Sequence, residues 1–487
     1  MELTPLDYKI RDIFPNESVF KEPKKSKLFS TLNIPSYMRD WIVKKFAKNE
    51  MEEIDLESVK EFIKEKIPRK KDLEYIKEKL INRQEKVEIL AKIIVYYDIS
   101  TGEALFELPE LGLPEKKYQA KIENYLIEKY KNELLSPEGT WGIITLYWRI
   151  EYIPHKKKHE GRIICTNFKP FKPYKVNLQY FKDARKQFSL DEWIDVMLRS
   201  MDYNPAAFYQ IERSKIWMIS RLLPFVEKRV NLIELAPKGT GKTYVYSQLS
   251  KYGWLVSGGS ISRAKLFYDL HRKKPGLVSG YDFVALDEVD TISFPDKEEI
   301  QGALKGYLEY GEYRIGHDRG IGEAGIILLG NIPYEKQDEN QFFLDTLPEV
   351  FKISALIDRF HGFIKGWEIP RMKEGMKAYG YGLNVEYFSE ILHELRDEVH
   401  YRKIIDQVFK ISKNADTRDI EAIKRISTGL LKLLFPHITS IEELSIEVFQ
   451  KYCLKPAMEM REVIRRQLHL MDKEYSFELP DIQVKYK

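Results

Sequence analysis

Apolar residues recur every three or four positions along two charged segments near the amino end of the chain, residues 55–66 and 71–86. This spacing places the apolar side chains on one face and is typical of amphipathic helices. The lysines and glutamates between them are those of solvated helix faces, and we assign them no chemistry. We therefore expect a mainly helical amino-terminal domain over residues 1–135.

The pattern changes in residues 141–153, where β-branched and aromatic residues predominate. Such side chains favour strands, and we expect further strands at residues 161–167 and 174–180. Loops that contain lysine and proline join the three segments. Together they predict a small β-rich domain, a barrel or a sheet, over residues 136–187.

Strand-like and helix-like segments then alternate between residues 231 and 331, which is the pattern of a parallel α/β sheet. Helical periodicity precedes this region at residues 190–201 and follows it over residues 381–472. We expect an α/β core over residues 188–370, and a helical lid and C-terminal helices over residues 371–487.

A glycine-bearing loop follows the apolar strand predicted at residues 232–235. Residues 236–243 read Ala-Pro-Lys-Gly-Thr-Gly-Lys-Thr, which differs from the strict Walker A pattern, G-x₄-G-K-[ST], by the alanine at its first position. Gly239 and Gly241 let backbone N–H groups face an anion, and Lys242 adds a positive charge for the β- and γ-phosphates. The residues expected to contact ATP are Pro237, Lys238, Gly239, Thr240, Gly241, Lys242, Thr243 and Tyr244.

Two carboxylates end the next buried strand, which is predicted within residues 281–288. We expect Thr243 and Asp287 to hold Mg²⁺, and Glu288 to polarise the attacking water. A further buried strand ends at Asn331, whose amide is expected to orient that water or to contact the γ-phosphate. Because the strands are parallel, these polar ends should meet at one edge of the sheet.

Composition narrows the class of protein. The chain is 43% hydrophobic and 13% aromatic, which excludes a wholly disordered protein. It contains no apolar run of about 18 residues, so no transmembrane helix is expected, and its start lacks the layout of a signal peptide. The two cysteines, Cys165 and Cys453, exclude a disulfide scaffold and a cysteine-rich zinc site. We expect a multidomain protein of the cytoplasm.

Positive charge is concentrated in residues 154–187, which hold ten basic and two acidic residues, although the whole chain has a formal charge of only +4. Lysines alternate here with aromatic residues, which suits a nucleic-acid surface with charges on the phosphates and rings against the bases. An equally good interpretation is a lysine-decorated barrel whose aromatic residues face its own core. The aromatic residues are Phe168, Phe171 and Tyr174, and the lysines expected to bind DNA are Lys156, Lys157, Lys158, Lys169, Lys172 and Lys175.

These motifs resemble those of AAA+ ATPases, in particular the MCM-like branch. The matching segments are the phosphate loop, Leu-Asp-Glu at 286–288, Leu-Gly-Asn at 329–331, Asp-Arg-Phe at 358–360 and Thr-Arg-Asp-Ile-Glu-Ala-Ile-Lys-Arg-Ile-Ser at 417–427. The chain is still more similar to the BrxL family of the BREX phage-defence systems, through residues 188–200, 257–259, 266–268, 304–309 and 361–370. The resemblance covers residues 180–435 well and the first 135 residues poorly.

The resemblance implies roles that spacing alone leaves unassigned. Arg359 corresponds to the arginine finger supplied to the ATP of a neighbouring subunit, Arg418 to sensor 2 and Asn331 to sensor 1. Residues 310–324 resemble the hairpin that MCM motors point into their central channel, with Arg319 near its tip as a DNA contact. The glycines of this segment agree with a hairpin, and a plain surface hairpin is the alternative.

The same resemblance implies an assembly and its partners. We expect ATP and Mg²⁺ as cofactors, and identical subunits that form a ring, either a hexamer or a stacked pair of rings. This ring is expected to bind double-stranded DNA through an OB-like barrel and to act in antiphage defence. Other BREX proteins are candidate partners.

The alternative function is an ATP-dependent factor that remodels or degrades polypeptides. BrxL proteins continue into a Lon-like protease domain with a Ser-Lys pair, whereas this chain stops at Lys487, so protease activity is not expected. A scaffold that binds ATP only to assemble is less consistent with the carboxylate pair of Asp287 and Glu288.

Overall fold

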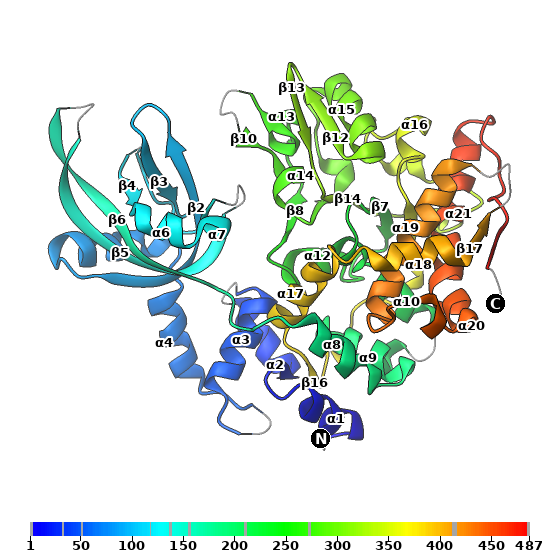
Figure 1. Cartoon of the computed structure of the whole chain (residues 1–487), viewed down its shortest axis with the longest axis horizontal. Coiled ribbons are helices and arrows are strands. Elements are labelled where there is room, and N and C mark those ends of the chain that lie inside the picture. The colour runs from blue at the N-terminus through cyan, green and yellow to red at the C-terminus, as the bar shows by residue number, and fades with distance from the viewer. Residues whose placement is uncertain are drawn as a thin grey trace. The chain divides into compact units, whose positions relative to one another are not determined.

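The chain folds into two compact units, which we call the barrel unit, residues Phe46–Pro173, and the sheet unit, residues Met1–Lys45 and Tyr174–Lys487 (Figure 1). The computed structural model describes residues 3–31, 34–49, 52–116, 118–135, 139–153, 157–208, 212–270, 274–411 and 416–484. Because the barrel unit is inserted after Lys45, the sheet unit is assembled from two separate stretches of chain.

Five parallel strands form the central sheet of the sheet unit, in the order β15-β7-β14-β11-β8. They are β7 (Leu232–Ala236), β8 (Gly253–Ser257), β11 (Phe283–Asp287), β14 (Gly325–Asn331) and β15 (Gly362–Lys365). Most are continuous apolar runs, as is usual for parallel strands that are covered on both faces. The predicted α/β core with a parallel sheet is confirmed.

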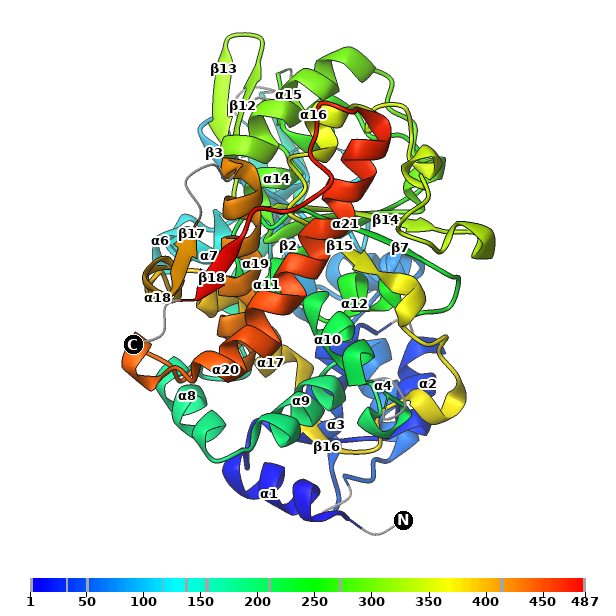
Figure 2. The same cartoon turned by 90° about the vertical axis from the view of Figure 1, so that its right-hand side faces the viewer.

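Helices cover both faces of this sheet. They include α11 (Leu223–Val226), α12 (Lys242–Gln248), α15 (Lys297–Tyr310), α19 (Thr417–Leu434) and α21 (Lys455–Met471). Val284 of β11 joins a large core with side chains of α15 and α21. Its neighbour Phe283 points to the opposite face, where its ring packs on Phe225 of α11 and Tyr246 of α12, with ring centroids 4.4 and 5.7 Å away. Figure 2 shows α21 lying across β15, with α19 beside it.

The first residues of the chain are part of the sheet unit. They form α1 (Pro5–Ile13), β1 (Ser18–Lys21), α2 (Pro23–Thr31) and α3 (Ser36–Phe46). β1 pairs in antiparallel fashion with β16 (Gly380–Leu383). The carboxylate of Asp7 accepts hydrogen bonds from the Tyr381 amide at 2.6 Å and from Arg199 at 2.7 Å. These contacts attach the amino-terminal segment to residues far along the chain, so a single helical domain over residues 1–135 is not what forms.

The barrel unit contains a closed five-stranded barrel in the order β2-β3-β4-β6-β5. Its strands are β2 (Val87–Asp98), β3 (Glu103–Glu107), β4 (Ala120–Ile122), β5 (Thr140–Ile153) and β6 (Lys158–Pro170), and its helices are α4 (Leu56–Lys66), α5 (Leu73–Lys77), α6 (Asn124–Lys129) and α7 (Lys131–Leu134). β4 and β6 run parallel, and the other neighbours are antiparallel. One apolar core fills the barrel, including Ile89, Phe106 and Phe168.

The predicted boundaries of the β-rich domain, residues 136–187, are therefore wrong. The strand predicted at residues 141–153 is β5, but β2, β3 and β4 all precede it. Residues 174–180 do not form a strand, because Asn177 begins helix α8 (Leu178–Lys186) by accepting a hydrogen bond from the Tyr180 amide at 3.1 Å. Asparagine is among the best residues at this capping position.

The helices expected around the sheet are present, with interruptions. The remaining elements of the sheet unit are α9 (Leu190–Ser200), α10 (Glu212–Ser220), α13 (Arg263–Leu266), β9 (Tyr268–Asp269), β10 (Lys274–Pro275), α14 (Leu277–Gly280), β12 (Glu312–Ile315), β13 (Asp318–Ile321), α16 (Ser354–Ile357), α17 (Val385–Leu395), α18 (His400–Val408), β17 (Phe409–Ile411), α20 (Ile446–Phe449) and β18 (Ile482–Val484). Within the described residues, no helix combines the length and apolar character needed to span a bilayer.

Candidate nucleotide site

The phosphate loop joins the end of β7 to the start of α12. Gly239 and Gly241 have left-handed backbones, with φ angles of 83° and 79°, which glycine adopts without strain. A Cβ atom on Gly241 would also lie 2.4 Å from the hydroxyl oxygen of Tyr203. Ala236 is the last residue of β7 and has no positive φ. Alanine at the first position of the motif therefore leaves the loop geometry intact.

Four of the predicted site residues meet at the carboxyl edge of the sheet. The ammonium group of Lys242 donates to the Asn331 side-chain oxygen at 3.0 Å. The hydroxyl of Thr243 donates to Asp287 Oδ2 at 2.6 Å. The juxtaposition follows from the strand order, because β7 lies beside β14 and β14 lies beside β11, all in parallel.

Lys242 is buried, with an exposed fraction of 7%. Burial lowers its pKa, and nearby carboxylates, of which Glu234 has the largest effect, oppose the shift. A further anion close to a buried ammonium group stabilises the charged form of that group. A bound phosphate would supply that anion.

A buried ion pair between Arg221 and Glu234 stabilises the phosphate loop. Arg221 and Glu234 have no exposed surface, and two hydrogen bonds join the guanidinium to both carboxylate oxygens. The same guanidinium donates to the backbone oxygen of Thr240 at 2.9 Å. Arg221 thereby fixes the loop between its two glycines.

Glu288 follows Asp287 in a left-handed conformation, with φ 49° and ψ 48°. This conformation is uncommon for a residue with a side chain and costs on the order of 1–3 kcal/mol. The backbone amide of Glu288 donates to Asp287 Oδ1 at 2.9 Å, while its own side chain is exposed. The turn therefore separates the two carboxylates, one buried beside Thr243 and one accessible to water.

The donor set fits a nucleotide with Mg²⁺. The described residues contain no group of three or more His, Cys, Asp or Glu side chains placed to hold a metal. Mg²⁺ is usually bound by one or two protein oxygens together with substrate phosphates, and Thr243 and Asp287 provide such oxygens. A cavity of about 810 Å³ adjoins the loop, lined among others by Pro237, Lys238 and Asn331. The buried hydroxyl of Thr240 has no hydrogen-bond partner among the described residues.

Two family models match the chain. The model described as "Lon-like protease BrxL-like, ATPase domain" matches residues 163–480. The model described as "BREX system Lon protease-like protein BrxL N-terminal" matches residues 12–148. The chain belongs to the BrxL family.

Two curated BrxL proteins show how far this similarity extends. The protein named "Lon-like protease BrxL" of Escherichia coli O9:H4 (strain HS) is 32% identical over 468 residues, which cover 95% of this chain and 64% of the relative. The protein of the same name from Bacillus cereus (strain H3081.97) is 29% identical over 468 residues, which cover 95% of this chain and 67% of the relative. The chain thus spans about two thirds of the length of these relatives.

Two arginines of the predicted BrxL site lie elsewhere in the sheet unit. Arg359 forms an ion pair with Glu309 at 2.7 Å, and Arg418 donates to the same carboxylate at 3.0 Å. Arg359 is two residues before His361, whose amide donates to the backbone oxygen of Asn231, directly before β7. Arg359 therefore lies at the amino edge of the sheet, whereas the phosphate loop follows its carboxyl edge.

Arg319 lies on the hairpin of β12 and β13. The two strands pair in antiparallel fashion, with Arg314 opposite Arg319, so the expected hairpin is present. Both arginines are exposed, and Arg319 forms an ion pair with Glu312. The hairpin presents two guanidinium groups close to its turn at Gly316.

The predicted DNA-binding lysines are divided between the two units. Lys156 lies outside the described residues, and Lys157 is exposed in the turn between β5 and β6. Lys158 pairs with Glu160 at 2.7 Å, and Lys172 lies 3.8 Å from Glu133. Lys169, on β6, and Lys175 are exposed, but Lys169 is in the barrel unit and Lys175 in the sheet unit.

Two of the three aromatic residues between these lysines are buried. Phe168 belongs to the barrel core, Phe171 is 4% exposed, and the hydroxyl of Tyr174 accepts a hydrogen bond from Asn384 at 2.8 Å. Lys182 and Arg185, which contribute to the charge of residues 154–187, are buried. The interpretation in which the aromatic residues face the protein interior is therefore correct for both phenylalanines.

Three further residues support the loop, and the sequence motifs do not include them. Arg221 and Glu234 are paired under the loop, and Tyr203 donates to the Gly241 oxygen at 3.3 Å. Arg221 and Tyr203 lie well before the loop motif in the sequence, and no motif connects them to it. Only Glu234, a glutamate within an otherwise apolar strand, indicates that a buried cation lies nearby.

Proposed function

We propose that this BrxL-family chain is an AAA+ ATPase that acts as a ring of identical subunits on double-stranded DNA in BREX phage defence. Lys242 and the loop amides would bind the phosphates of ATP, and Thr243 and Asp287 would hold Mg²⁺, which neutralises phosphate charge when bound. Glu288 would accept a proton from the attacking water, with Asn331 orienting the γ-phosphate or that water. The proposed location is the cytoplasm.

The position of Arg359 and Arg418 carries the proposal of a ring. Both are anchored on Glu309, and Arg359 lies at the amino edge of the sheet. The five residues of β7 separate the two edges by roughly 16 Å. An arginine at that edge is poorly placed for the phosphates of its own chain, but a neighbouring subunit can present its loop to it. A closed ring repeats this contact at every interface.

The proposal of DNA binding is supported by the barrel and by the hairpin. The five-stranded barrel, with its single parallel pair β4–β6, is consistent with the OB-like module that serves nucleic-acid binding in many proteins. The exposed Lys157 and Lys169 of the barrel unit and the exposed Arg314 and Arg319 of the hairpin supply cations for phosphate groups. Encircling and translocation are both compatible with this arrangement.

The test compares two stimulants of ATP hydrolysis. Duplex DNA should raise the ATPase rate of the full chain several-fold, and casein should leave it unchanged. Glu288→Gln provides the background, because contaminating ATPases are unaffected by it. Stimulation by casein without stimulation by DNA would overturn the DNA proposal and favour a factor that acts on polypeptides. Both relatives carry the name "Lon-like protease BrxL", which is consistent with that second function.

A further inference from the structure

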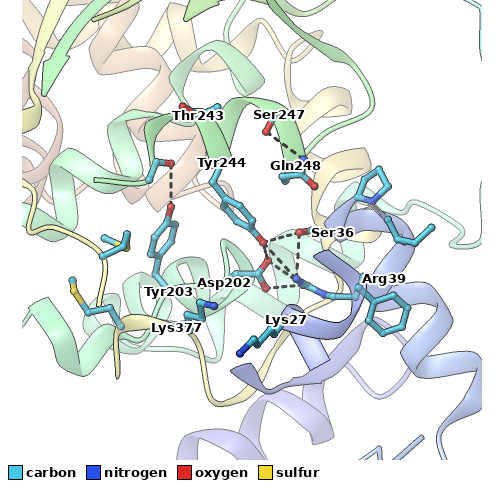
Figure 3. A pocket seen from close by; sticks show the side chains of 16 residues that line it. Lys27, Ser36, Arg39, Asp202, Tyr203, Thr243, Tyr244, Ser247, Gln248 and Lys377 are labelled. Atoms are coloured by element: carbon cyan, nitrogen blue, oxygen red, sulfur yellow. Dashed lines mark hydrogen bonds and ion pairs between the residues drawn. The ribbon is translucent and has the colours of Figure 1, made fainter. Parts of the chain in front are cut away.

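A second cavity, of about 700 Å³, lies beside the phosphate loop within the sheet unit. Its lining comes from four parts of the chain: the amino-terminal segment, residues 202–203, the end of the phosphate loop with α12, and residues 372–377 (Figure 3). Thr243 lines this cavity and also contacts Asp287. The cavity therefore begins at the end of the loop where the phosphates of a nucleotide would be held.

The amino-terminal segment is tied to the loop by a buried polar network. The hydroxyl of Tyr244, the residue after Thr243, lies 2.6 Å from Ser36 Oγ and donates to the Asp202 carboxylate. Arg39 donates to both oxygens of that carboxylate, at 2.7 and 2.9 Å. Figure 3 shows the side chains of Ser36, Arg39, Asp202 and Tyr244 converging at one end of the cavity.

The buried network contains a carboxylate, and positively charged side chains lie beside it. Burial would raise the pKa of Asp202, but Arg39 and Lys21 outweigh that effect and hold the pKa well below its usual range. The carboxylate is therefore ionised at neutral pH and keeps Arg39 and Tyr244 in fixed positions. A buried network whose members are all hydrogen-bonded is rigid.

The remaining walls suit a mainly apolar group with a few polar substituents. Phe29, Ile34 and Met376 are buried, with exposed fractions of 0%, 5% and 8%. Ser247 and Gln248 of α12 add hydrogen-bonding groups on the side of the loop. Small-molecule sites combine apolar walls with few polar contacts in this way.

We propose that this cavity takes the nucleoside of the bound nucleotide, and that Arg39 and Asp202 are positioning residues that hold Tyr244 as one of its walls; this rests on the proposed ATPase function. The amino-terminal segment then becomes a component of the nucleotide site, although it falls largely within the N-terminal family match, residues 12–148. Nucleotide binding would then change the surroundings of α3, the helix that continues to Phe46, where the barrel unit begins.

The test separates the nucleoside from the phosphates. Calorimetric titration of the full chain with Mg²⁺-ADP and with Mg²⁺-tripolyphosphate measures the two parts independently. Arg39→Ala and Tyr244→Phe should weaken ADP binding, by about tenfold for Arg39→Ala, and leave tripolyphosphate affinity within about twofold. The preference for ADP over CDP should fall in parallel. The matched control is Tyr401→Phe, which removes a buried hydroxyl bonded to the Pro436 oxygen at 2.6 Å and should alter neither affinity.

Each outcome has a distinct meaning. Equal losses for ADP and tripolyphosphate would show that the network only supports the loop, and unchanged ADP affinity in both variants would show that the cavity holds no nucleoside. Either result overturns the inference. Lys242→Ala should weaken both ligands, and its failure to do so would instead overturn the proposed nucleotide site. If Arg39→Ala does not fold, Ser36→Ala and Tyr244→Phe test the same network with smaller changes.

Discussion

Glu288 stands directly after β11 with a backbone conformation that few side chains adopt. The strained turn leaves its carboxylate exposed beside the buried Asp287. We expect Glu288→Gln to bind ATP like the wild type but to hydrolyse it about a hundredfold more slowly, because an amide cannot accept the proton of the attacking water. Single-turnover hydrolysis and equilibrium nucleotide binding measure the two effects. Wild-type turnover by Glu288→Gln would exclude this carboxylate as the base.

His393 provides a pH-dependent contact between α17 and the sheet. Its Nδ1 lies 2.8 Å from Asp282 Oδ2, and its ring stacks on Tyr252 with centroids 3.8 Å apart. Burial lowers the pKa of His393, but the hydrogen bond and charge of Asp282 outweigh it, so the pKa is raised. A raised histidine pKa stabilises the fold fully below about pH 6.5 and loses this effect as pH rises through the folded-state pKa.

We therefore expect the loss of thermal stability in His393→Gln to be largest near pH 6 and to shrink towards pH 9. Thermal unfolding across this range measures it. His437→Gln is the matched control, because burial lowers the pKa of His437 to about 4. That histidine stays neutral in the fold while the unfolded chain takes up protons below about pH 6.5, so its variant should show the opposite trend. A pH-independent loss in His393→Gln would contradict the assignment.

At the level of single residues, the sequence predicts which side chains meet beside the loop, but it does not predict the residues that support the loop. Lys242, Thr243, Asp287 and Asn331 are brought together as expected, because parallel strands deliver their carboxyl ends to one edge. Arg39 reaches the loop from a position that no spacing rule connects to it. Such contacts depend on how distant segments pack, which local patterns do not encode.

Among the elements, the hairpin of β12 and β13 and the turn between β5 and β6 would contact DNA through different cations in the proposed function. We expect Arg319→Ala to lose most of the stimulation of ATPase activity by DNA while retaining DNA affinity within about twofold. A double Lys157→Ala, Lys158→Ala variant should instead weaken binding and reduce the slope of log affinity against log salt by about one for each phosphate that is no longer neutralised. Fluorescence anisotropy over a salt series and ATPase assays on both variants measure the difference.

Lys60→Ala, which removes an exposed lysine paired with Glu57 on α4, is the control for a general change of charge. An unchanged salt slope in the double variant would show that the turn is only solvated. Unchanged DNA stimulation in Arg319→Ala would favour the alternative of a plain surface hairpin.

The errors in predicted elements have local causes. β2 reads Val-Glu-Ile-Leu-Ala-Lys-Ile-Ile-Val-Tyr-Tyr-Asp, a β-branched and aromatic run that the charged helices before it obscure. At residues 174–180 the apolar positions resemble a strand, although Asn177 marks the start of α8. The long strands β5 and β14, by contrast, are continuous enough to be recognised from composition alone.

For the whole molecule, the placement of Arg359 makes a prediction about assembly. Arg359→Ala should bind ATP but lose hydrolysis, because the transition-state charge is left unstabilised. Mixing it with Lys242→Ala subunits, which keep Arg359 but lose ATP binding, should restore part of the activity through interfaces that combine an intact loop with an intact arginine. ATPase assays over a range of mixing ratios measure the rescue. No rescue in preparations with demonstrated mixed assembly would contradict action between subunits.

The bond between the Tyr381 amide and Asp7 joins residues 374 positions apart, and this separation bears on synthesis. On a ribosome that adds about 5–20 residues per second, the partner of α1 emerges roughly 20 to 75 s after α1 itself. The barrel unit, complete at Pro173, has all its strands in the meantime and can fold first. The nascent chain would therefore carry a folded barrel while α1 and β1 still lack their partner β16. A chaperone that shields this amino-terminal segment would act before the sheet unit has folded.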